Sequence, residues 1–343
     1  MAKKLDLSGI LYSGEMGRNF SRWHKFDYMG FDGTFEDFCD DLGDKLMKVQ
    51  KEQGIFKDEL ELRQDLVVLY ANCMWLKYRK IYDFHPAFVD ILADSECGKI
   101  SRELLSRLPY RAFYIHFGER PMPKVAFRDT TNCVISGIQV VFDFPKDSNE
   151  VLMTLVTNYN KIGEKDPREC FVLPNVLRLT DDEPFETAYN YTKVSDEDLI
   201  ELKTTKEEVA ETVEFWSYFD RIALNAANYL CASNAELKDI RISKAERKKQ
   251  APDNGKRAIA VSTTQVGYRL GAKFEKMYQD SVHVTGVSRG FGTKKRPHVR
   301  RAHWHHYWTG SGRTVLSVKW LEPIYVVGDA EECEPVVHEV KGA

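Results

Sequence analysis

The sequence lacks the segments that carry a protein into or across a membrane. None of its 343 residues lies in an apolar run approaching the roughly 18 residues that a membrane-spanning helix requires. The segment Met1–Leu11 includes two lysines, but it has neither the apolar stretch nor the small-residue cleavage site of a signal peptide. We therefore expect a cytoplasmic protein with no membrane partner.

Motifs of familiar cofactor and metal chemistry are also missing. The seven cysteines are widely spaced and form no CxxC pair, which predicts reduced thiols in the interior instead of disulfides or a zinc knuckle. The chain contains no P-loop, no GxGxxG after a strand, no GxSxG and no HExxH. We accordingly expect no cofactor and no metal.

Acidic residues are scarce in one part of the chain, although the net charge is only −3. Residues 238–313 contain eighteen Lys and Arg against five Asp and Glu, a local charge of +13 that leaves −16 for the remainder. This separation predicts an anionic partner, either nucleic acid or an acidic protein face. The alternative is a solvated basic loop, or a basic face neutralised by the acidic remainder of this chain or of a second copy in a homo-oligomer.

What the sequence does contain is the composition of a folded protein and a hydrophobic period that changes along the chain. Residues 1–32 are rich in glycine and aromatics and predict an irregular arm, whereas 34–53 and 57–80 have helical spacing. Short β-branched and aromatic runs then predict a mainly antiparallel sheet. These runs cover residues 111–117, 124–128, 133–144, 151–158 and 170–178.

The second half of the chain repeats this order of a helix followed by strands. A long helix is predicted from about Thr204 to Ala232, where Thr205 and Glu208 have the spacing of a capping box. Strands with one helix near Ala272–Tyr278 follow. The order is typical of an α+β protein with a helical N-terminal part, a central mostly antiparallel sheet, a long helix and a C-terminal β-rich basic module.

We divide the chain into four predicted segments, because residues 236–257 are polar and basic and read as a linker. The segments are an aromatic arm with helices (1–110), the central sheet and long helix (111–235), the basic linker (236–257) and the C-terminal β-rich basic module (258–343).

Residues 294–313, KKRPHVRRAHWHHYWTGSGR, have the most distinctive composition. If residues 299–308 form a strand, its side chains alternate between two faces. One face then holds Arg301, His303, His305 and Tyr307, and the other holds Arg300, Ala302, Trp304, His306 and Trp308. Gly310 and Gly312 predict a tight turn into a return strand over Val315–Trp320. We expect a hairpin with one buried side, supported by Trp304, Trp308 and Trp320, and one functional side.

Several interpretations of the functional side remain open. Arginines neutralise phosphates and exposed aromatics stack on bases, which favours RNA binding. Two histidines beside an arginine also suit a metal-independent ribonuclease, for which His303 and His305 are the candidate catalytic residues. The same His-x-His pair has metal-ligand spacing, although its cationic surroundings oppose a cation. Finally, the histidines could simply stack and hydrogen-bond within a basic hairpin.

The candidate nucleic-acid-binding residues are therefore the cations, histidines and tyrosine of this segment. They are Lys294, Lys295, Arg296, His298, Arg300, Arg301, His303, His305, Tyr307 and Arg313.

The run from Lys295 to Trp308, with Gly310 and Gly312 after it, resembles the C-terminal signature of the second type V-A anti-CRISPR family. This family occurs in phages and other mobile genetic elements. Three shorter stretches agree with it in the same order along the chain. They are Leu108–Pro109 before the strand at 112–117, Val266–Gly271 (VGYRLG), and Trp320 with Pro323 and Tyr325–Val327.

The resemblance implies a protein that evades the CRISPR immunity of a bacterial host. The family is associated with recognising the nascent N-terminal region of the type V-A nuclease and provoking translation-dependent decay of its message. The implied partners are this nascent segment and, on the basic hairpin, RNA or the ribosome. A ribonuclease and a non-catalytic module that docks on an acidic protein surface remain the alternatives, and we expect target choice to reside in the N-terminal half.

Overall fold

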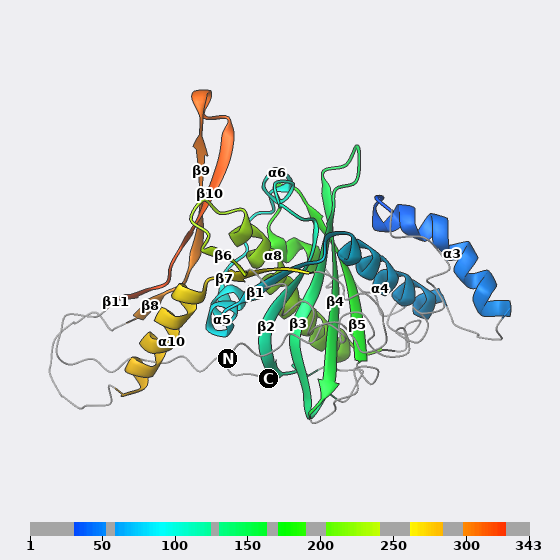
Figure 1. The fold of residues 1–343 in the computed structure, drawn as a ribbon, viewed down its shortest axis with the longest axis horizontal. Coiled ribbons are helices and arrows are strands. Elements are labelled where there is room, and N and C mark those ends of the chain that lie inside the picture. The colour runs from blue at the N-terminus through cyan, green and yellow to red at the C-terminus, as the bar shows by residue number, and fades with distance from the viewer. Residues whose placement is uncertain are drawn as a thin grey trace.

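A computed structural model describes residues 31–52, 59–124, 130–162, 171–189, 204–240, 261–283 and 298–326. A seven-stranded sheet separates two groups of helices, and a β-hairpin projects from one end of the molecule (Figure 1). This arrangement confirms the predicted α+β class. Among the described helices, none is both long and apolar enough to cross a membrane. The predicted arm, most of the predicted linker and the C-terminal acidic residues lie outside the described ranges.

The sheet has the order β5-β4-β3-β2-β1-β7-β6. Its first four strands form an antiparallel meander, as the alternating runs at 111–178 predict. The strands are β1 (Lys80–Phe84), β2 (Ala112–Pro121), β3 (Cys133–Asp143), β4 (Glu150–Lys161), β5 (Phe171–Thr180), β6 (Leu237–Ile240) and β7 (Ser262–Val266). The predicted strand at 124–128 lies almost entirely outside the described residues.

Two strands depart from the predicted organisation. Strand β1 pairs in parallel with both β2 and β7, so residues before and after the long helix meet in one sheet. All five residues of β1 are buried, which removes the alternation that marks a half-exposed strand. The prediction of a linker is wrong at Leu237–Ile240, because these residues form β6 on the edge of the same sheet.

The helices α3 (Phe35–Glu52) and α4 (Glu59–Tyr78) cover one face of the sheet, close to the predicted bounds. Thr34 begins α3, since its hydroxyl accepts a hydrogen bond from the Asp37 amide at 3.3 Å and the Asp37 carboxylate accepts from Thr34 in return. Their apolar sides pack against Ala112, Val141 and Val156 of the sheet.

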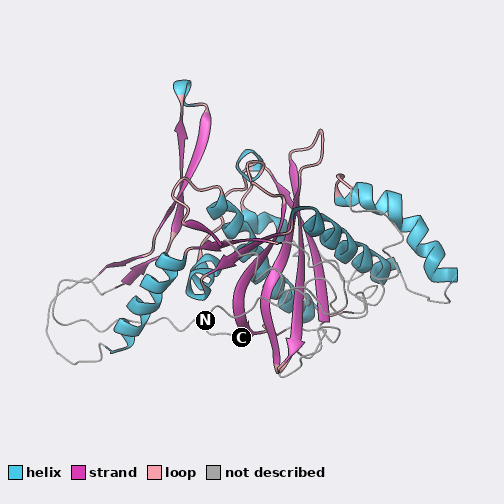
Figure 2. Cartoon of the chain, in the orientation of Figure 1, coloured by secondary structure: helices cyan, strands magenta, loops and turns pink. Residues whose placement is uncertain are grey.

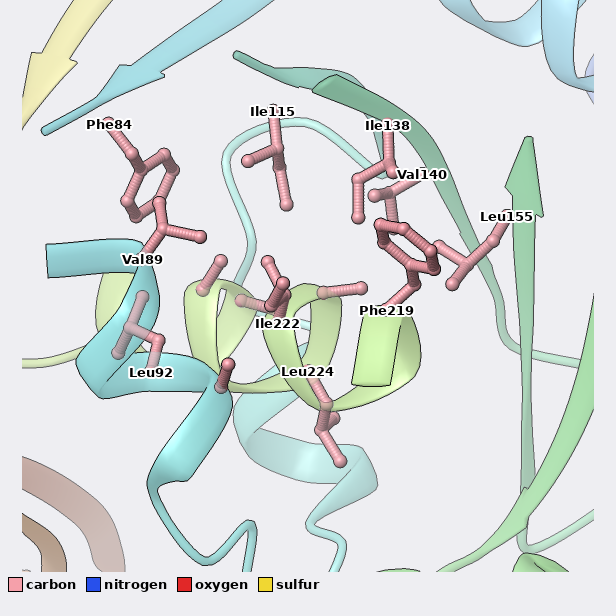
Figure 3. Close-up of a cluster of buried hydrophobic side chains, with 14 of the residues drawn as sticks. Phe84, Val89, Leu92, Ile115, Ile138, Val140, Leu155, Phe219, Ile222 and Leu224 are labelled. Atoms are coloured by element: carbon pink, nitrogen blue, oxygen red, sulfur yellow. The ribbon is translucent and has the colours of Figure 1, made fainter. Parts of the chain in front are cut away.

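The opposite face carries the other helices and the larger core. The long helix α8 (Lys206–Leu230) begins with the predicted capping box, in which Thr205 and Glu208 each cap the other's backbone amide. Figure 3 shows Ile222 and Phe219 of α8 facing Ile138 and Val140 of the sheet, and Val89 of α5 close to Phe84 of β1. The elements on this side are α5 (Pro86–Asp94), α6 (Arg102–Leu105), the 3₁₀ turn η2 (Phe185–Tyr189), α8 and α10 (Tyr268–His283).

The C-terminal strands form two small two-stranded sheets (Figure 2). Strand β8 (His298–Arg300) pairs with β11 (Ile324–Val326), and β9 (His303–Thr309) pairs with β10 (Val315–Leu321). The single strand predicted over 299–308 is therefore wrong. The strand is interrupted at Arg301–Ala302, and the side chain of Ala302 is buried in the main core.

Candidate functional site

The candidate site is the hairpin β9–β10, which extends beyond the helices at its base (Figure 1). The turn at its tip uses Gly310 and Gly312 at φ values of 79° and 74°, which L side chains rarely adopt. Arg313 follows in the same left-handed region, at φ 53°. The predicted hairpin and its turn are confirmed.

The base of the hairpin is fixed to the body through Trp320. This side chain is 1% exposed, and its ring meets Phe88, Tyr229 and Phe274 edge to face at centroid distances of 5.1, 5.9 and 6.2 Å. The Asn234 amide accepts a hydrogen bond from the Trp320 backbone N–H and donates one to its carbonyl. Trp320 therefore holds the base of the hairpin against the core.

A second anchor joins the hairpin to α8. Half-buried Trp304 donates its indole N–H to Asn225 Oδ1 at 2.8 Å. The amide nitrogen of Asn225 donates in turn to the carbonyls of Leu92 and Ser95, at 2.7 and 3.0 Å. Because Asn225 is fully buried, these bonds fix the orientation of Trp304 against the body.

The opposite side of the hairpin is open and carries three of the predicted residues. His303, His305 and Tyr307 share this side, facing Leu321, Lys319 and Ser317 across the ladder. The rings of His305 and Tyr307 stack at a centroid distance of 5.9 Å and an interplanar angle of 28°. Sequence reasoning missed Lys319, whose ammonium lies 5.5 Å from the centre of the Tyr307 ring, although alternation along the return strand places it there.

Trp308 is where the predicted hairpin packing is wrong. It lies on the same side as Trp304 and Trp320, yet its side chain is 54% exposed. It lies in the part of the hairpin that extends beyond the described helices (Figure 1). His306, the next residue of β9 on this side, is exposed, and its pKa is lowered by desolvation from the surrounding protein and by the neighbouring charge of His305.

The other predicted residues are divided between described and undescribed parts. Arg301 and Arg313 are exposed, and Arg301 acts electrostatically on Asp94, whose pKa burial raises and Arg301 lowers. The structure describes the backbone of His298 and Arg300, in β8, but not their side chains. Lys294, Lys295 and Arg296 lie outside the described residues. Residues 298–321 contain no Asp or Glu, so Arg301, Arg313 and Lys319 have no acidic neighbour within the segment itself.

Two imidazoles, of His303 and His305, lie on the open side of one strand, and each has one described contact with the protein. His303 Nδ1 lies 3.4 Å from the Arg301 carbonyl, and His305 stacks on Tyr307. Within the described ranges, no three His, Cys, Asp or Glu side chains are placed to hold a metal ion. The surface is suited to binding phosphates and flat rings, with proton transfer as a further capability of the two histidines.

The VGYRLG segment builds a separate polar cluster at the ends of the parallel strands. Tyr268 donates its hydroxyl to Asp83 Oδ2 at 2.6 Å, and the other oxygen of Asp83 lies 2.6 Å from His116 Nδ1. Burial and the bond to Asp83 raise the pKa of Tyr268. A Cβ on Gly267 would lie 2.3 Å from the Phe88 ring, and one on Gly271 would lie 2.2 Å from His85, so both glycines allow α10 to approach α5.

A cavity of about 310 Å³ lies at the far side of the sheet from the hairpin base. Phe35 and Val67 line it from the N-terminal helices, and Leu152 and Val176 line it from β4 and β5. Arg178 at its rim pairs with Glu36 at 3.0 Å.

Comparison with known proteins gives a family that covers both the cluster and the hairpin. A solved structure titled "Crystal structure of AcrVA2" matches 94% of this chain and 94% of that chain, at 16% identity and a TM-score of 0.43. No curated protein matches the chain. The model of the AcrVA2-like family, described as the anti-CRISPR type V subtype A2 family, matches residues 82–328, which is more than half of the sequence. The chain belongs to this AcrVA2-like anti-CRISPR family.

Proposed function

We propose that the protein suppresses production of a type V-A CRISPR nuclease in the cytoplasm of a bacterial host. It recognises the nascent nuclease and lowers the level of its messenger RNA, and the hairpin β9–β10 is the surface that faces RNA or the ribosome. One observation carries the proposal. The open side of the hairpin collects two exposed histidines and the exposed Lys319 around Tyr307, inside the part of the chain that matches the anti-CRISPR family.

Electrostatics support this role for the hairpin. Arg301, Arg313 and Lys319 are exposed, and no acidic residue between 298 and 321 neutralises them. Nucleic acids are polyanions, and the binding of their phosphates to Lys and Arg releases condensed counterions. We therefore expect the interaction to weaken steeply as salt concentration rises.

Recognition of the nascent chain belongs to the other half of the molecule in this proposal. The cavity between α3, α4 and the strands β4 and β5 combines apolar walls with Arg63, Glu36 and Arg178. Its helical wall precedes residue 82, outside the region that matches the family, which suits a part that varies with the target.

Co-expression in bacteria tests the proposal. The protein is expressed beside a tagged type V-A nuclease, and the nuclease and its message are both followed. A matched nuclease gene with a blocked start codon is the control. We expect the message to fall only when it is translated. A message that is unchanged in both strains would contradict the proposal.

The ribonuclease alternative has its own support, because His303 and His305 lie on one side of a cationic strand. It predicts that the purified protein cleaves free RNA, that the rate follows a bell-shaped pH profile, and that His303→Ala abolishes cleavage. In the co-expression experiment it predicts loss of the message with or without the start codon, which separates it from the primary proposal.

A further inference from the structure

The tip of the hairpin presents a large aromatic surface that the fold leaves unused. Trp308 is 54% exposed, and Val315, which pairs with Thr309 on the other side of the ladder, is 46% exposed. Among the described residues, the Trp308 side chain makes no hydrogen bond and no ring contact, whereas Trp304 and Trp320 on the same side are held by Asn225 and by the core aromatics. The exposed indole therefore has a free face on which a nucleotide base can stack.

The other side of the hairpin carries a second flat surface. His305 and Tyr307 stack on each other, and Lys319 lies over the face of Tyr307. The Tyr307 hydroxyl lies 3.0 Å from Ser233 Oγ, which fixes the ring against the body while leaving the histidine exposed. The hairpin therefore has one aromatic platform on each side, with cations near both.

We infer that the hairpin binds single-stranded RNA by stacking, with Trp308 taking an unpaired base at the tip and the His305–Tyr307 pair taking a second base. Arg313 at the turn and Lys319 on β10 contact the phosphates between these bases. This inference rests on the proposed function and specifies the form of nucleic acid that the RNA-facing surface takes. It gives Trp308 a role as a binding residue.

The two platforms favour an unpaired strand over a duplex. In an A-form duplex the bases already stack on one another, and the major groove is too narrow for protein side chains to reach them. Unpaired bases have free faces, and an aromatic ring accepts any of them without regard to sequence. The aromatic platforms also favour RNA over an acidic protein, since a protein partner recognised by charge would need only the cations.

Direct binding tests the inference. The full-length protein is titrated into a fluorescein-labelled 12-nucleotide oligouridylate and, separately, into a 12-base-pair RNA duplex, and fluorescence anisotropy is followed at two salt concentrations. We expect tighter binding to the single strand. Trp308→Ala should weaken that binding about 5- to 150-fold, the range that corresponds to losing one stacked base worth about 1–3 kcal/mol.

Two variants control for other causes. Trp308→Phe keeps a stacking face and should bind close to the wild-type level, which separates stacking from loss of bulk. Ile162→Ala removes a residue that is 65% exposed at the end of β4, far from the hairpin in the chain, and should leave binding unchanged. Equal affinity of wild type and Trp308→Ala for the oligouridylate, a duplex bound as tightly as the single strand, or no RNA binding at all would overturn the inference.

These outcomes separate the inference from the proposed function. If the protein suppresses nuclease message in cells but binds no oligouridylate, the stacking role fails and the proposed function stands with a protein surface of the ribosome as the partner. If it binds the single strand through Trp308 but the message is unaffected in cells, the stacking role stands and the proposed function fails.

Discussion

Two segments of the chain resemble the anti-CRISPR family, and they use their residues in different ways. In Val266–Gly271, each distinctive residue has a task in folding: Gly267 and Gly271 let helices approach, and Tyr268 pairs with the buried Asp83. In the hairpin β9–β10, Trp320, Trp304 and Val318 are used in this way, whereas His303, His305 and Trp308 stay exposed.

The difference separates side chains that pack or hydrogen-bond within the fold from side chains that are exposed and can contact a partner. His303, His305, Lys319 and Trp308 are exposed, and their removal should not harm the packed interior. Side chains that make no contribution to packing can be replaced without loss of the fold, so a binding role for them can be tested separately from stability. The stability of single variants is therefore a test of the whole comparison.

The largest expected effect is at the base of the hairpin. Trp320→Ala removes a fully buried indole from between three aromatic rings, and we expect a loss of about 3–5 kcal/mol in the free energy of unfolding. Urea denaturation measures it. Trp308→Ala is the matched control on the same side of the same hairpin, with an expected change within about 0.5 kcal/mol. Similar losses in the two variants would remove the distinction between base and tip.

The next effect tests the glycine in the VGYRLG segment. Gly267 has a φ of 64°, and an added Cβ would collide with the Phe88 ring, so Gly267→Ala should cost about 2–5 kcal/mol in unfolding free energy. Gly98 has nearly the same φ, 67°, but nothing lies within 4 Å of its missing Cβ. Gly98→Ala should therefore cost only about 1–2 kcal/mol. An equal cost at the two sites would show that close packing against Phe88 is not what requires Gly267.

A smaller effect concerns the polar cluster at the strand ends. Tyr268→Phe leaves one oxygen of the buried Asp83 without its donor, and we expect a loss of about 1–3 kcal/mol. Tyr218→Phe is a fitting control, because the Tyr218 hydroxyl accepts only a long bond from Arg120 at 3.4 Å. The two variants are compared by thermal and urea unfolding at neutral pH. If Tyr268→Phe is as stable as the wild type, the cluster has a purpose other than holding α10.

The smallest expected effect on stability is in the open side of the hairpin. The double variant His303→Ala/His305→Ala removes two exposed side chains, and its unfolding free energy should stay within about 1 kcal/mol of the wild type. Its salt-sensitive binding to RNA should weaken. A strongly destabilised double variant would mean that the histidines belong to the fold, as the purely structural interpretation of the hairpin holds.

Local features were predictable from the sequence, and long-range ones were not. Spacing within a few residues predicts the capping box of Thr205 and Glu208 and the antiparallel meander. It also predicts that His303, His305 and Tyr307 share one side of the hairpin. The parallel pairing of β1 with β7 joins residues about 180 positions apart, which no local pattern specifies. Strand alternation also assigned Trp308 to the correct side of the hairpin, but it could not show that the body ends before the tip.

The central claim is that the cationic segment made of β8, the residues Arg301–Ala302 and the hairpin β9–β10 is the effector of suppression, and one measurement tests it most directly. The double variant Arg300→Ala/Arg301→Ala is co-expressed with a translated type V-A nuclease gene, the nuclease message is quantified, and the unfolding midpoint of the purified variant is compared with that of the wild type. We predict that the message returns to its level in cells without the protein while the midpoint is unchanged. Full suppression by a correctly folded double variant would contradict the claim.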